Sequence, residues 1–230
     1  MNYLRGLIAL FILCGMSLNA SYLHKDELIY NPAFEQAIEK IGSELEEKSG
    51  IRVLLVMLKK LPKDVGMVEY ERTLLKEATT PTVLLAFSEL DMKIDILVSD
   101  NKLYELFDKE QILSPAASFV QAVVMAVFYA HDFDSFRSMI SNYGGTIAPI
   151  LAQKAKDNEL HSKYSAAMFN GYADLASQIA SSQNIKLDSD VGEANQNSIM
   201  FVKLIFYGFI LYAIYLMFRR KIAKGSDEKR

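Results

Sequence analysis

The sequence predicts an α/β fold, in which a mixed β-sheet of about three to four strands is flanked by helices and followed by a single C-terminal transmembrane helix. Short apolar runs of strand length alternate with stretches of helical periodicity, and a 20-residue apolar run stands near the C-terminus. The 230 residues are 51% hydrophobic and 23% charged. That is enough apolar material for one folded domain, and it excludes a disordered tail protein.

The N-terminal residues 1–20 have the layout of a secretory signal peptide. A basic residue precedes the apolar run Leu7–Leu18, and small residues follow it. At about 1.5 Å per residue, these 12 residues extend about 18 Å, less than the roughly 30 Å core of a bilayer. We expect cleavage after Ala20; since Leu18 is large for its place before the cut, an uncleaved anchor is the alternative. The single cysteine, Cys14, lies in this run, which excludes a disulfide framework and a Cys/His zinc site.

The exported domain is expected over residues 22–180 and begins with a helix. Asn31-Pro32 supplies an N-cap with proline at the first helical position, apolar residues then recur at helical spacing, and Gly50 ends the helix. The segment Ile51–Leu58 follows directly and is almost wholly apolar. Such a run predicts a strand that is covered on both faces.

A second helix and two further strands are predicted next. Residues 65–78 have helical spacing, and the proline after Thr80 ends this helix before a strand over Thr82–Phe87. Ser88–Asp91 forms a tight connection into a third strand over Met92–Val98. The strands joined by a helix should be parallel, and those joined by the short turn antiparallel. The stripe of the second helix consists of Met67, Tyr70 and Leu74.

The remainder of the domain is predicted to be helical. Ser114-Pro115 is expected to cap an apolar helix that reaches about Ala130, and we predict a buried core helix there rather than another membrane span. A short helix, a segment over residues 146–156 and a long amphipathic helix follow. The amphipathic helix places Leu160, Tyr164, Met168, Tyr172, Leu175 and Ile179 on one side.

The segment Ile199–Phe218 is predicted to be a transmembrane helix, reached through a polar linker over residues 182–198. Its 20 residues match the membrane core in length, and its one charge lies a single turn from the start, where a long side chain reaches the headgroups. The tail 219–230 holds six basic and two acidic residues, so the C-terminus is expected in the cytoplasm. Membrane anchoring is assigned to Lys203, Arg219, Arg220 and Lys221.

Charge and topology together predict a single-pass protein of the bacterial inner membrane, with its N-terminal domain in the periplasm. The whole chain has a net charge of −3 although its tail is basic, so the exported part is strongly acidic. A surface of that sign repels nucleic acid, which we exclude as a partner. The expected partners are the lipid bilayer and a membrane protein.

Five short segments carry a resemblance to a known family: Glu46–Gly50, Ile51–Val56, Val83–Phe87, Lys93–Ile96 and Ile147–Leu151. Together with the order of the elements, they resemble the TPM domain, a family named after thylakoid proteins, phosphatases and a receptor modulator. The resemblance covers residues 22–180. It implies an α/β sandwich tethered near a membrane, with roles in the assembly or maintenance of membrane complexes and, for some members, acid phosphatase activity.

Polar residues follow two neighbouring strands where a ligand of an open α/β sheet tends to bind. The candidates are Lys59, Lys60, Lys63, Ser88, Glu89 and Asp91. Lysines at this edge could meet a phosphate, and the acids a hard divalent cation such as calcium or magnesium. Ordinary solvated turn residues are the alternative. Asp100 and Asp132 are expected to cap helices rather than to bind metal.

Two functions remain open from the sequence. The favoured one is a membrane-tethered module for protein interaction and for assembly or maintenance of membrane complexes, because no catalytic motif is found. The alternative is a weak phosphatase, either divalent-ion-dependent or acid, which would use the strand-end residues.

Overall fold

The computed structural model describes residues 21–189, and nearly all of them belong to a compact unit that ends at Ile185. Strands come mainly from the first half of this unit and helices from the second, as the sequence predicts. In chain order the elements are β1 (Leu23–Asp26), α2 (Pro32–Ser49), β2 (Arg52–Leu58), α3 (Met67–Leu75), β3 (Thr82–Ser88), β4 (Lys93–Val98), the 3₁₀ helix η1 (Asn101–Leu106), α4 (Lys109–Leu113), α5 (Phe119–Tyr129), α6 (Phe133–Ser141), α7 (Ala148–Leu151), the 3₁₀ helix η2 (Asp157–Glu159) and α8 (Leu160–Ser182).

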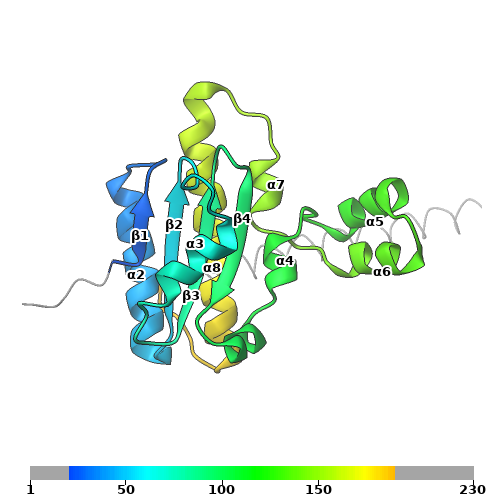
Figure 1. Ribbon diagram of the computed structural model, residues 1–230. Coiled ribbons are helices and arrows are strands. Elements are labelled where there is room, and N and C mark those ends of the chain that lie inside the picture. Colours follow the sequence, from blue (N-terminus) through cyan, green and yellow to red (C-terminus); the bar gives the residue numbers. More distant parts are fainter. Residues whose placement is uncertain (1–20, 190–230) are drawn as a thin grey trace, which may run out of the picture. The chain divides into compact units, whose positions relative to one another are not determined.

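The four strands form one mixed sheet in the order β1-β2-β3-β4 (Figure 1). β2 is parallel to β3 and β3 is antiparallel to β4, which confirms both predicted orientations. β1 pairs with β2 in parallel and was not predicted. Its four residues, Leu-His-Lys-Asp, are too few and too polar to give the apolar run on which a strand prediction depends.

Helices cover both faces of the sheet: α2 and α8 lie on one side and α3 on the other (Figure 1). On the α3 side, Val56, Leu84 and Ala86 pack with Met67 and Leu75 in one buried cluster. The other side buries the predicted stripe of α8, where five of its six members are buried. These five are Tyr164, Met168, Tyr172, Leu175 and Ile179.

Local signals set the predicted helix ends. The Asn31 side chain accepts a hydrogen bond from the Ala33 N–H, and α2 ends at Gly50, whose φ of 72° is left-handed backbone that suits glycine. Asp100 accepts from the Lys102 N–H at the start of η1. Asp132 forms a capping box with Ser135 at the start of α6, so both aspartates act as the predicted caps.

The prediction for the helix after Ser114 is wrong in two respects. Ser118, not Ser114, caps α5: the Ser118 side chain accepts a hydrogen bond from the Gln121 N–H, whereas the Ser114 hydroxyl donates to the Asn142 carbonyl at 2.7 Å. α5 is not a core helix either: of its residues only Ala122 and Ala126 are buried, because α5 packs mainly on α6. In the expected helical segment 146–156, only Ala148–Leu151 is α-helical.

The predicted signal peptide, the membrane span and the basic tail lie outside the described residues. Across residues 21–189, no helix has both the length and the apolar character needed to cross a membrane.

Candidate functional site

The structure brings most of the predicted strand-end residues together. β2 and β3 run in register so that Leu58 faces Ser88, and the turns after both strands therefore meet at one edge of the sheet. There the Lys59 ammonium lies 2.5 Å from a Glu89 carboxylate oxygen. The other oxygen of Glu89 accepts a hydrogen bond from the Tyr164 hydroxyl at 3.0 Å. These two contacts of Glu89 link the turns to each other and to α8.

Asp91 has a matching role within these turns. Its Oδ2 accepts the Leu61 N–H at 2.7 Å and the Ser88 hydroxyl at 2.6 Å. The backbone donor first, and the hydroxyl second, lower the pKa of Asp91. Burial, followed by the hydrogen bond to Glu89, raises the pKa of Tyr164 to about 12. Tyr164 is therefore a neutral donor at ordinary pH, and both strand-end acids already make contacts within the protein.

A hollow of about 490 Å³ lies beside these turns, but it takes in only part of the predicted set. Lys60 and Asp91 line it, whereas neither Lys59 nor Glu89 does. The charged lining residues are Lys60, Lys63, Lys93, Asp64 and Asp91. Since two carboxylates share the walls with three ammonium groups, the hollow attracts an anion only weakly. Within residues 21–189, no three or more His, Cys, Asp or Glu side chains gather where they could hold a metal ion.

A group of charged side chains around the buried Glu71, on α3, β4 and α4, was not identified from the sequence. Glu71 of α3 is fully buried beneath the helix. Burial, followed by the nearby charge of Asp95, raises the pKa of Glu71 to about 8. Lys109 of α4 lies 2.6 Å from Asp95 and also donates to the Ile96 carbonyl at 2.7 Å on the edge strand. Glu71 is therefore mostly protonated at pH 7 and lies near the ion pair of Lys109 and Asp95.

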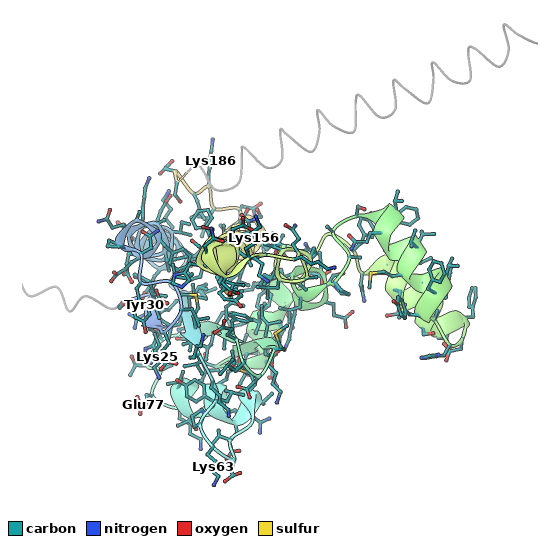
Figure 2. The ribbon with its side chains drawn as sticks, turned by 90° about the horizontal axis from the view of Figure 1, so that it is seen from above. Lys25, Tyr30, Lys63, Glu77, Lys156 and Lys186 are labelled. Carbon is teal, nitrogen blue, oxygen red and sulfur yellow. The ribbon has the colours of Figure 1, made fainter. Side chains whose placement is uncertain are left out.

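Within the described residues, the α5–α6 hairpin has an exposed apolar surface. Seven of its large side chains are between 51% and 77% exposed, and one of them, Phe119, packs edge-on against Tyr143. We call the other six the hairpin surface; they are Val120, Val124, Val127, Phe128, Tyr129 and Phe133. Figure 2 shows the two light-green helices side by side, with side chains pointing outward.

The helical period explains how the surface arises. Ala122 and Ala126 face α6, and Val120, Val124, Val127 fall on the opposite side of α5. Composition alone predicts a buried helix, since α5 contains no charged residue in its 11 positions. Apolar composition without a covering layer gives an exposed apolar surface instead, a feature that in soluble proteins marks an interaction site.

No protein-family model matches this chain, and no curated protein has a matching sequence. The resemblance to the TPM domain therefore depends on the short segments quoted above and remains a proposal.

Proposed function

We propose that this chain is a membrane-tethered, periplasm-facing module that takes part in the assembly or maintenance of membrane complexes, and that it docks through the hairpin surface. The single observation behind this proposal is the exposure of six large apolar side chains on two adjacent helices. Leaving such a surface in water is unfavourable by about 25 cal/mol for each Å² of apolar area. A partner that covers it therefore gains binding energy without first having to open the domain.

The predicted topology supports the same function. An anchor at Ile199–Phe218 with a basic tail would hold the domain at the periplasmic side of the bacterial inner membrane. Tethering raises the effective concentration of any partner in the same membrane, so a modest apolar surface is enough for stable docking. The resemblance to the TPM domain implies this kind of role as well.

The phosphatase alternative has less support. Groups of the protein already contact three of the four carboxylate oxygens of Glu89 and Asp91: Lys59 and Tyr164 at Glu89, and two donors at a single oxygen of Asp91. We therefore rank docking above an acid or a divalent-ion-dependent phosphatase.

Photocrosslinking in the intact membrane tests the proposal. A benzophenone side chain replaces Val124 in the hairpin surface of the full-length chain, and in the control it replaces Leu90, which is 60% exposed in the turn after β3. We expect a discrete adduct with a membrane component from position 124 and none from position 90. Equal or absent adducts at both positions would refute docking through the hairpin.

A further inference from the structure

We infer that the tip of the α5–α6 hairpin enters the interfacial layer of a zwitterionic lipid bilayer, so that the domain touches the membrane at a second point besides its anchor. This inference rests on the proposed function and specifies what its docking surface binds. Three features of the hairpin lead to it: where its aromatic side chains lie, how its backbone is satisfied at the tip, and which charges it bears.

The aromatic side chains gather around the tip. Phe128 and Tyr129 end α5, and Phe133 begins α6, so exposed rings flank the connecting turn from both helices. Phe128 and Phe133 are each 77% exposed. A protein groove or a second copy of the chain would cover one face of the hairpin, whereas rings on both helices suit a medium that surrounds the tip. Aromatic and aliphatic side chains of this kind favour the boundary between headgroups and acyl chains.

The backbone N–H groups at the tip are paired within the chain. The Ala130 N–H donates to the Ala126 carbonyl at 3.0 Å, which closes the last turn of α5. The N–H groups of His131 and Asp132 both donate to the Ser135 hydroxyl oxygen, at 3.0 and 3.1 Å. The Ser135 N–H donates in turn to Asp132 Oδ1 at 2.7 Å. Since an unpaired N–H group is costly outside water, this pairing of the donors suits a turn at headgroup depth, where water still reaches its carbonyl oxygens.

The charges of the hairpin determine how deeply its tip enters the bilayer and which lipid headgroup it accepts. Hydrogen bonds from the Ser135 backbone and hydroxyl lower the pKa of Asp132, so Asp132 is ionised at the turn and holds the tip at headgroup level. α6 adds Asp134 and Arg137, and α5 adds no charge. Without a basic cluster the hairpin has no means to select anionic lipid, and zwitterionic lipid is sufficient.

The chain between the domain and its predicted anchor permits the contact. Sixteen residues separate Ser182, the end of α8, from Ile199, and fully extended they reach at most about 55 Å. The bilayer is therefore always within reach of the domain, and weak interfacial binding becomes effectively intramolecular.

The chain contains no tryptophan, so one introduced tryptophan reports its surroundings without background. We would place it by Phe128→Trp or Phe133→Trp at the tip, and by Leu90→Trp as the control. The full-length chain is reconstituted into phosphatidylcholine vesicles, with and without acyl-brominated phosphatidylcholine, which quenches tryptophan on contact. We expect at least twofold stronger quenching, and a blue-shifted emission, for both tip reporters than for the control.

Quenching of the tip reporters no stronger than that of Leu90→Trp would overturn the lipid inference. If crosslinking at position 124 still gave a protein adduct, the proposed docking function would stand, and its partner would be a protein or a second copy. A full-length chain that fails to float with the vesicles would instead contradict the tether itself.

Discussion

Replacing Glu71 with glutamine should stabilise the domain at neutral pH. The folded protein raises the pKa of this buried side chain from 4.5 to about 8. Between these values the folded chain holds a proton that the unfolded chain releases, so stability is highest below pH 4.5 and falls as the pH rises toward 8. At pH 7 the free energy of unfolding is lower than below pH 4.5 by about 3 kcal/mol, since each pH unit above 4.5 contributes about 1.4 kcal/mol. Glutamine has the shape of the protonated acid and no proton to lose.

Urea unfolding of fragment 21–198, followed by circular dichroism at pH 5 and pH 7, measures this effect. We expect the free energy of unfolding of Glu71→Gln to exceed that of the wild type by up to about 3 kcal/mol at pH 7 and by under about 1 kcal/mol at pH 5. The control is Glu77→Gln, on an exposed side chain just beyond α3, which should change little at either pH. A Glu71→Gln variant that is less stable than the wild type at pH 7, or a gain that is equal at both pH values, would refute the reasoning.

Two further predictions concern the strand-end turns and the helix packing. Glu89→Ala combined with Asp91→Ala should lower the urea midpoint of unfolding. Phosphate-ester hydrolysis, and calcium or magnesium binding measured by calorimetry, should stay at the wild-type level. Loss of turnover or of ion binding would support the phosphatase alternative. Gly171→Ala should destabilise the fragment by about 1–3 kcal/mol in the same urea assay, because a Cβ there would lie 2.2 Å from Ile147 Cδ1. Gly66→Ala has free space and should not lower stability by a comparable amount; equal losses in both variants would contradict this explanation.

Much of the sheet could be predicted because its signals are local. The predicted runs Ile51–Leu58 and Thr82–Phe87 have strand length and differ from β2 and β3 by one residue at one end. The cap residues Asn31 and Gly50 mark the ends of the helix before them. Strand direction followed from the length of each connection. β1 could not be found this way, because a four-residue edge strand depends on its neighbour for pairing rather than on its own composition.

The site was harder to predict, since it depends on which side chains meet. Spacing placed Glu89 and Asp91 at the correct sheet edge, but no local pattern indicated that Tyr164, 75 positions later, would bind Glu89. A charged residue on a helix is usually solvated, so Glu71 gave no sign of its burial. For the apolar stripe that contains Val120 the prediction was wrong in the opposite direction. An apolar run indicates that exposure to water is unfavourable, but it does not indicate whether the domain itself or a partner will cover it.

Docking of the hairpin surface is tested most directly by thiol accessibility in the membrane. Val124→Cys and Leu90→Cys are made in a Cys14→Ser background of the full-length chain, and labelling rates with a membrane-impermeant maleimide are compared in native membranes and in fragment 21–198. We predict that position 124 is labelled at least tenfold more slowly in membranes than in the fragment, while position 90 is labelled at the same rate in both. Equal labelling of position 124 in the two settings would show that the hairpin surface is uncovered and would contradict the proposed function.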